Sequence, residues 1–395
     1  MEYRRFGSTE LKMPVMTLGC MRFQAAWDRK KRVPRGCQEN LERLVGHALK
    51  QGINHMETAR GYGTSEKQLG RILPHLPRHE ILLQTKVGPR KKRSEFRADV
   101  EDSMKTLGVD YLDLLALHGL NNEEILEQGL KRTGSIRELI KLKEEGVVRH
   151  IGFATHGPPE SNLKAIQTGL FDYVNLWYSY IYQDNWHAIQ EARSRDMGVF
   201  VISPNDKGGM LYTPPPKLRK LTRPLTPMQF NDLFSLSHRQ IHTLSVGAAR
   251  PSDLDQHVEA VDKAKAWRRK MKAAKKRMDD AMKRAVGATW AKRYREGLPS
   301  WDETPGQINI ASILWLRNLT LAYDMLEYGK MRYNLLGNAG HWFPGNKANA
   351  LEELDPKALR KSLRRSPLRD QVIDALREAH RILSGEEVHR LGGEH

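Results

Sequence analysis

Residues 52–63, GINHMETARGYG, hold a short strand pattern followed by a tyrosine between two glycines. The first half indicates a strand with Glu57 near its end, and the Gly-Tyr-Gly sequence predicts a turn that projects Tyr62. Two later segments have the same form: ILLQTKVG places Lys86 at the end of an apolar strand, and YLDLLALHG places His118 there. If the three strands belong to one parallel barrel, their carboxyl ends meet at one mouth. The four side chains would then share a site.

The strand–helix pattern extends in both directions from this stretch. A hairpin is expected at the N-terminus, followed by a first core strand near residues 15–18 and a helix that ends at Gly52. Four further strands are expected after His118, at residues 150–155, 173–179, 198–203 and 242–248. Eight strands that alternate with helices over about 250 residues predict a parallel (β/α)8 TIM barrel, an α/β fold. We place this barrel at residues 1–261.

Residues 262–395 lack the strand–helix alternation, and their sequence predicts a mainly helical extension that packs on the barrel. A long helix is expected at residues 264–295, where lysine and arginine are dense, and an apolar, buried helix at residues 310–326. A glycine-punctuated loop at residues 337–345 could either cover the barrel mouth or pack beneath the barrel. Further helical segments are expected near residues 356–383.

The formal net charge of +18 allows an anionic ligand or a nucleic-acid partner. Much of this charge lies in the helix predicted at residues 264–295. A solvated face of an appended helix is the favoured interpretation, because few aromatic residues are interleaved with the cations. We therefore expect no nucleic-acid partner, and binding through the basic helix stays an alternative hypothesis.

Composition excludes several other classes of protein. The chain is 39% hydrophobic and 28% charged, as soluble globular proteins are. No apolar run approaches the roughly 20 residues of a membrane span, and the first residues lack the apolar core of a secretory signal, so we expect a cytoplasmic protein. With Cys20 and Cys37 as its only cysteines, the sequence predicts no disulfide scaffold, cysteine-ligated cluster or metal site.

The four residues at the predicted mouth suit carbonyl reduction by hydride transfer. Negative charge develops on the carbonyl oxygen, so a proton donor and hydrogen-bonding groups are needed there. Tyr62 is a reluctant acid at its ordinary pKa near 10, and the ammonium of Lys86 would lower that pKa. Glu57 would offset the cost of burying the lysine charge, and His118 would orient the substrate oxygen. Each of the four residues alone has a commoner structural explanation, so the prediction of an active site rests on their occurrence together at three successive strand ends.

The cofactor prediction rests on two later loops. No GxGxxG fingerprint follows a strand, which argues against a Rossmann dinucleotide site. ISPNDKGG at residues 202–209 follows the seventh predicted strand, and VGAARPSDLDQH at residues 246–257 follows the eighth. Barrel phosphate sites lie after these two strands, where helix N-terminal amides face the anion. Lys207 and Arg250 add positive charge, although a plain turn and an ordinary helix cap explain the same two segments.

These motifs resemble those of the aldo-keto reductase family. The likeness rests on HMETARGYGTSE, QTKVG, LDLLALHG, IGFATHG and SVGAARPSDLDQHVEAV, five motifs in the family's order within residues 1–261. The resemblance implies an NADP(H)-dependent oxidoreductase without a metal, in which Tyr62 is the general acid, Lys86 its activator, Glu57 the buttress and His118 the substrate orienter. The family usually has aspartate where Glu57 stands.

The resemblance also implies a set of residues that hold the cofactor. These are Thr155 and Asn175 at the nicotinamide carboxamide, Ser203, Asn205 and Lys207 at the pyrophosphate, Gly247 in the adenosine-phosphate loop, Arg250 at the 2′-phosphate, and Gln256 and His257 at the adenine.

The leading hypothesis is an NADP(H)-dependent aldo-keto reductase-type enzyme. It would reduce a small aldehyde or ketone, or oxidise the alcohol, with Tyr62 as general acid and base. The alternative is an NADPH-binding redox-sensing or regulatory subunit with slow turnover, suggested by Glu57 and by the long basic extension. The sequence does not define the substrate, the preference for NADPH over NADH or the oligomeric state.

Overall fold

The computed structural model describes residues 1–338 and 344–388. The chain divides into two compact units. The first comprises Met1–Gly208 and Asn231–Trp267, and the second comprises Gly209–Phe230 and residues 268–388. Most of the loop predicted at residues 337–345 lies outside the described residues.

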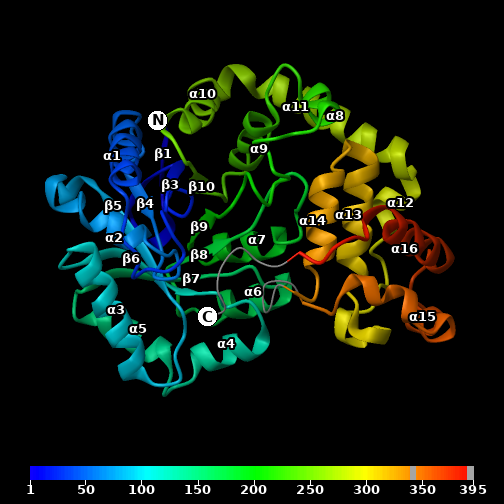
Figure 1. Cartoon of the computed structure of the whole chain (residues 1–395), viewed down its shortest axis with the longest axis horizontal. Helices are drawn as coiled ribbons and strands as arrows, with labels where there is room; N and C mark the ends of the chain where they lie inside the picture. The colour runs from blue at the N-terminus through cyan, green and yellow to red at the C-terminus, as the bar shows by residue number, and fades with distance from the viewer. Residues whose placement is uncertain (339–343, 389–395) are drawn as a thin grey trace. The chain divides into compact units, whose positions relative to one another are not determined.

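The first unit contains the predicted (β/α)8 barrel (Figure 1). Eight parallel strands close into a ring in the order β10-β3-β4-β5-β6-β7-β8-β9. Pairing of Leu244 with Met16 joins the last strand to the first. The strands are β3 (Met16–Gly19), β4 (His55–Glu57), β5 (Leu82–Val87), β6 (Leu112–His118), β7 (Val148–Ala154), β8 (Tyr173–Leu176), β9 (Gly198–Val201) and β10 (Thr243–Gly247).

Burial on both faces explains why these strands are nearly continuous apolar runs. In β6 every residue from Leu112 to Leu117 is buried, because one face packs inside the barrel and the other against helices. The surrounding helices are α1 (Arg35–Lys50), α2 (Ser65–Gly70), α3 (Arg93–Leu107), α4 (Glu123–Leu130), α5 (Ser135–Glu144), α6 (Pro159–Gln167), α7 (Trp186–Ser194) and α10 (Asp255–Asp262).

An N-terminal hairpin closes the end of the barrel at which the strands begin. β1 (Tyr3–Arg5) pairs antiparallel with β2 (Lys12–Pro14), as the sequence predicts. The hairpin carries Phe6 into a buried cluster with Tyr173 and Phe200 of the barrel strands. This end is filled with apolar side chains, so the opposite end, where the strands finish, is left for chemistry.

The second unit is helical. It contains α8 (Pro216–Thr222), most of α11 (Ala264–Val286), α12 (Ala288–Arg293), α13 (Ile310–Tyr323), α14 (Leu326–Leu335), α15 (Pro356–Ser362) and α16 (Arg369–Leu383), and α9 (Pro227–Leu236) joins the two units. The prediction of one continuous helix at residues 264–295 is wrong, because Gly287, with φ 85°, separates α11 from α12. The sequence patterns predict no helix at α8.

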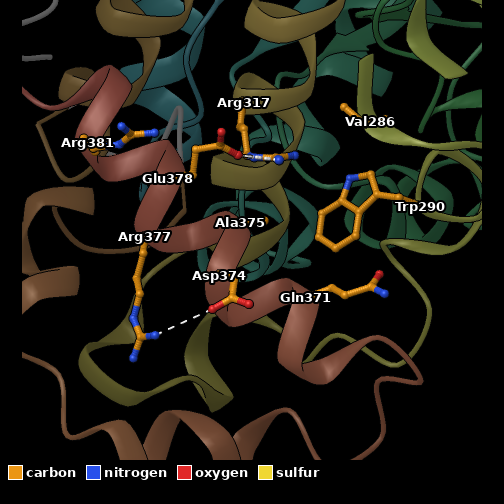
Figure 2. Close-up of a pocket in the computed structure, with 9 residues that line it drawn as sticks. All are labelled: Val286, Trp290, Arg317, Gln371, Asp374, Ala375, Arg377, Glu378 and Arg381. Carbon is orange, nitrogen blue, oxygen red and sulfur yellow. Dashed lines mark hydrogen bonds and ion pairs between the residues drawn. The ribbon is translucent and has the colours of Figure 1, made fainter. Parts of the chain in front are cut away.

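Trp290 and Arg317 line a surface pocket of the second unit, with residues of α16 along its side (Figure 2). Arg317 donates a 2.6 Å bond from Nε to Glu378, and its guanidinium lies 5.6 Å from the Trp290 ring. The indole N–H of Trp290 donates to Asn318 Oδ1 at 3.0 Å. These contacts tie α12, α13 and α16 together, so Arg317 and Glu378, which line the pocket, have a structural role.

No helix in the described parts of the chain combines the length and apolar character needed to cross a membrane.

Candidate active site

The four side chains predicted to share a site come together at the carboxyl ends of neighbouring strands. Glu57 is the last residue of β4, Lys86 is one residue before the end of β5, and His118 is the last residue of β6. These three strands are adjacent in the ring. Tyr62 lies in the turn between β4 and α2. Parallel pairing therefore brings residues separated by as many as 61 positions to one mouth.

Lys86 and Glu57 form a buried ion pair. Their relative exposures are 1% and 3%, and Lys86 Nζ donates to Glu57 Oε1. Lys86 also donates to the Thr58 carbonyl at 2.7 Å, while Ser245 Oγ donates to the second Glu57 oxygen at 2.8 Å. Burial lowers the pKa of Lys86, and the Glu57 charge opposes that change. The carboxylate thus has two partners and holds the ammonium at a fixed place.

The Tyr62 ring packs against both Lys86 and His118. Lys86 Nζ is 4.6 Å from the centroid of the tyrosine ring. The His118 ring centroid lies 5.7 Å from it, with an interplanar angle of 84°. A positive charge this close favours the tyrosinate form, and an edge-on imidazole stands beside the same ring. The arrangement therefore joins a proton donor, a cation that can assist it and a polar ring.

The turn that carries Tyr62 is held from both sides. Tyr62 N–H donates to the Ala59 carbonyl at 2.9 Å, and Thr64 N–H donates to the Ala26 carbonyl at 3.0 Å. Gly63 has φ 54°, and a Cβ atom there would stand 2.0 Å from the Ala26 oxygen. The loop containing Ala26 consequently requires glycine next to the tyrosine.

We expect Gly63→Ala to impair the site more than it destabilises the fold. The clash with Ala26 and the positive φ cost about 1–3 kcal/mol, and relief of both requires movement of the neighbouring Tyr62. Steady-state turnover should fall at least about tenfold. Gly88→Ala is the matched control, since Gly88 also follows a barrel strand and has open space at its Cβ position. Equal turnover in the two variants would show that the turn does not position the tyrosine.

The predicted nicotinamide contacts lie at the ends of β7 and β8. Asn175 is fully buried in β8, and neither its Oδ1 nor its Nδ2 has a hydrogen-bond partner among the described residues. Thr155 follows β7, and its hydroxyl lies 2.9 Å from the Leu120 carbonyl and 2.7 Å from Asn162 Oδ1. Buried amides are normally satisfied, so both polar atoms of Asn175 are available to a ligand, and its contact with the nicotinamide stays a prediction.

The loop after β9 contains the predicted pyrophosphate residues. Asn205 is buried, and its amide nitrogen lies 3.2 Å from His257 Nε2. Lys207 is also buried; its ammonium bonds His156 Nδ1 and lies 5.4 Å from the Trp177 ring centroid. In this structure the Lys207 side chain is therefore directed towards the ends of β7 and β8.

Sequence reasoning did not find Arg22, which supplies another cation close to these loops. It follows β3, and a Cβ atom on Gly247 would be 2.9 Å from Arg22 Cδ. Its guanidinium is 3.4 Å from Asp206 in the loop after β9. Arg22 lies three residues beyond the end of β3. Because the ends of all the strands meet at the mouth, this position alone could have marked Arg22 as a candidate site residue.

The segment after β10 places Arg250 and Gln256 at the surface and His257 inside. Arg250 is 75% exposed in its side chain and donates from Nε to Asp253 at 2.8 Å. Asp253 also accepts from the Ala249 and Arg250 amides at the start of a short 3-10 helix. The arginine predicted to contact the phosphate is therefore already paired with Asp253, the third residue of the 3-10 helix that it caps.

His257 is 1% exposed, and its two ring nitrogens face Asn205 and Asp232. The Asp232 oxygen is 2.5 Å from Nδ1. His257 thus fastens the loop after β9 to α9 and α10, a role that sequence reasoning missed because Asp232 is 25 residues away in an unrelated helix. Its predicted contact with adenine stays a prediction.

Comparison with known proteins agrees with this architecture. Residues 15–272 match the sequence model of the Aldo/keto reductase family. L-galactose dehydrogenase of Arabidopsis thaliana is 26% identical over 293 residues, which cover 66% of this chain and 88% of that protein. The uncharacterized oxidoreductase YqkF of Bacillus subtilis is 28% identical over 195 residues, covering 44% of this chain and 58% of that protein.

A solved structure shows the same fold. The holo form of an aldo-keto reductase from Bacillus halodurans superposes with a TM-score of 0.59 at 22% identity, covering 70% of this chain and 96% of that one. Residues 273–395 lie outside the matched family segment.

Proposed function

The chain belongs to the aldo/keto reductase family, and from this membership we propose that it reduces a small aldehyde or ketone with NADP(H), or oxidises the corresponding alcohol. Family membership makes the chain an oxidoreductase of a family that generally uses nicotinamide cofactors. The finer proposal, that Tyr62 acts as general acid and base on a carbonyl compound with NADP(H), rests on the site.

The observation that carries the proposal is the packing of Tyr62 on a buried Lys86–Glu57 pair beside His118. Lys86 stabilises the negative charge that Tyr62 acquires when it gives its proton to the substrate oxygen. Glu57 keeps the ammonium charged and in place despite its burial. His118 stands at the edge of the tyrosine ring, where it can donate a hydrogen bond to the same oxygen and orient the carbonyl.

The residues around this cluster fit a nicotinamide cofactor. Asn175 offers a buried donor and a buried acceptor with no partner among the described residues, the complement of a carboxamide. Arg22 and the loops after β9 and β10 supply cations and backbone amides suited to phosphates. When bound, the reduced nicotinamide supplies the hydride. The protein side of the reaction is then proton delivery by Tyr62 and orientation of the substrate oxygen.

The preference for NADP(H) is proposed from Arg250, which stands at the surface beside the start of η4 (Pro251–Leu254). A 2′-phosphate could replace Asp253 as partner of the guanidinium, whereas NADH offers no such group. Dissociation constants for NADPH and NADH, compared between the native protein and Arg250→Ala, test this. We expect the variant to lose about tenfold in NADPH affinity and to bind NADH unchanged, as for loss of one charge-assisted hydrogen bond.

Glu57 also bears on the alternative of a slow redox-sensing subunit. The extra methylene relative to aspartate does not prevent contact, because Glu57 bonds both Lys86 and Ser245. The feature that suggested impaired catalysis therefore keeps the lysine in place, which favours an enzyme.

We expect Asn175→Ala to weaken NADPH binding about tenfold to a hundredfold. Two hydrogen bonds to the carboxamide are lost, each worth about 0.5–1.5 kcal/mol. Quenching of protein fluorescence by NADPH measures the effect. Asn54→Ala is the control, because Asn54 precedes β4 at the other end of the barrel. Unchanged affinity in Asn175→Ala would remove this residue from the cofactor site.

The proposed function is tested by NADPH consumption at 340 nm against a panel of aldehydes, ketones and quinones. Turnover with one class of carbonyl compound supports it and opens the question of substrate. Purified protein that does not bind NADPH at all would end the proposal. Binding without any turnover would favour the redox-sensing alternative.

A further inference from the structure

α11 concentrates positive charge to an unusual degree. Residues 268–295 contain twelve lysines and arginines against two aspartates. Within α11, intervals of one, three, four and eleven residues place several exposed cations on the same side of the helix. This side, here called the cationic face, consists of Arg268, Arg269, Lys272 and Lys283. From its first to its last residue it extends about 22 Å at 1.5 Å per residue.

The opposite side of α11 is anchored in the second unit. Its buried residues are Met271, Ala274, Met278 and Ala281. Tyr323 of α13 donates its hydroxyl to the Met278 carbonyl at 3.3 Å. Because this side is packed, the cationic face has a fixed orientation and is exposed to solvent.

Acidic side chains neutralise two other cations of α11, in the stretch between Lys272 and Lys283. Lys275 pairs with Asp279 at 2.8 Å, and Lys276 pairs with Asp280 at 2.7 Å. Among residues 1–338 and 344–388, Arg268, Arg269 and Lys272 have no carboxylate at ion-pair distance, whereas Asp280 lies near enough to Lys283 for that cation to contribute to lowering the pKa of Asp280. Arg268, Arg269 and Lys272 are exposed, lie within five residues of one another and repel each other, so packing alone does not account for them.

The basic end of α8 adds to this surface. Arg277 of α11 donates to the carbonyls of Leu221 and Arg223, which fixes the last turn of α8 beside α11 (Figure 1). That turn carries the exposed side chains of Arg219 and Lys220. Two segments of the second unit, separated by more than forty residues, thus contribute cations to one region.

We propose that the cationic face of α11 binds the phosphate backbone of double-stranded nucleic acid without regard to sequence. A duplex carries one negative charge per about 1.7 Å of its axis, so a row of cations meets phosphates in any register. Solvation of the helix was the favoured interpretation from the sequence. The excess of twelve cations over two carboxylates in residues 268–295, with Arg268, Arg269 and Lys272 clustered and exposed, favours a polyanionic partner.

Other polyanionic partners fit the surface less well. An amphipathic membrane anchor needs exposed apolar side chains, yet the exposed large hydrophobic residues of the described chain, Trp27 and Leu170, are both in the first unit. A protein interface would also need an apolar centre. Single-stranded nucleic acid is bound by stacking on exposed aromatic rings, which the cationic face lacks. A duplex requires phosphate contacts alone.

The test is fluorescence anisotropy of the full chain with labelled 24-base-pair DNA and RNA duplexes of two unrelated sequences. Four phosphate contacts predict a slope of about −3.6 for the logarithm of affinity against the logarithm of salt concentration, a loss of about a hundredfold between 50 and 200 mM salt. Neutralisation in Arg268→Gln/Arg269→Gln/Lys272→Gln should reduce the slope by about three, since each cation contributes about one. A preference for one duplex identifies the biological form.

A matched control separates the surface from the net charge. Lys361→Gln/Arg364→Gln/Arg365→Gln removes the same three charges from exposed positions at and beyond the end of α15, at the far end of the second unit from α11 (Figure 1). This variant should keep the native slope and affinity within about twofold. Circular dichroism checks that both triple variants are folded. Equal losses in the two variants, no binding to either duplex at 50 mM salt, or tighter binding to single strands or to anionic lipid vesicles would overturn the proposal.

Discussion

Tyr62→Phe is expected to lower kcat by about a thousandfold while NADPH binds as tightly as before. The substitution removes one oxygen atom, the proton donor, and leaves the ring that packs on Lys86 and His118. General acid catalysis contributes about 10²–10⁴-fold to such reactions, and the remaining groups cannot deliver a proton from the same position. Turnover with the best substrate of the carbonyl panel and NADPH titration by fluorescence measure the two quantities.

Tyr111→Phe is the control for loss of a phenol hydroxyl. Tyr111 lies just before β6, at the opposite end of the barrel, where its ring packs against Arg78 and Arg149. It should keep native turnover. If Tyr62→Phe also keeps native turnover, another group donates the proton and the proposed mechanism is wrong. If it loses NADPH binding as well, the loss of activity says nothing about proton transfer.

Lys86→Met is expected to have two large effects that can be measured separately. Turnover should fall at least a hundredfold, because Tyr62 loses the charge that favours its ionised form. The free energy of unfolding should fall by about 3–5 kcal/mol, because Glu57 would remain buried at 3% exposure without its cation. Urea titration followed by tryptophan fluorescence measures the second effect.

The double variant Lys86→Met/Glu57→Gln distinguishes the structural role of the pair from its catalytic role. Removing both charges should recover at least about half of the lost stability, with no recovery of turnover. Lys164→Met serves as the comparison, because Lys164 and Glu123 form a largely exposed pair whose loss should cost less than about 1 kcal/mol. Equal destabilisation by Lys164→Met and Lys86→Met would contradict a buried, energetically important pair at the site.

The barrel and the meeting of its four mouth residues could be predicted because both depend on local patterns. Each strand is a buried apolar run, and strand direction alone decides that Glu57, Lys86 and His118 meet. The extent of the long helix was less predictable. Its amino-acid composition favours a helix up to residue 295, but Gly287 has φ 85° and ends α11, which composition does not reveal.

Contacts between loops could not be predicted in the same way. Arg22 lies against Gly247, and His257 bonds Asp232 in a different helix. Such pairs depend on how far each loop extends and which rotamer each side chain adopts, and neither leaves a periodic signal. The sequence therefore identified candidate residues after β9 and β10, but it did not reveal the bonds of His257 to Asn205 and Asp232.

The bond from Ser245 to Glu57 has a consequence for how the protein reaches its working state. Ser245 belongs to β10, the last strand of the ring, and is separated from Glu57 by 188 positions. A newly made chain that has reached β9 already contains Tyr62, Lys86 and His118, but one oxygen of the carboxylate still lacks its partner. The final strand both closes the ring and completes the environment of the buried pair. Catalytic competence should consequently appear late in folding, together with closure of the barrel, and an incomplete barrel should be an inactive one.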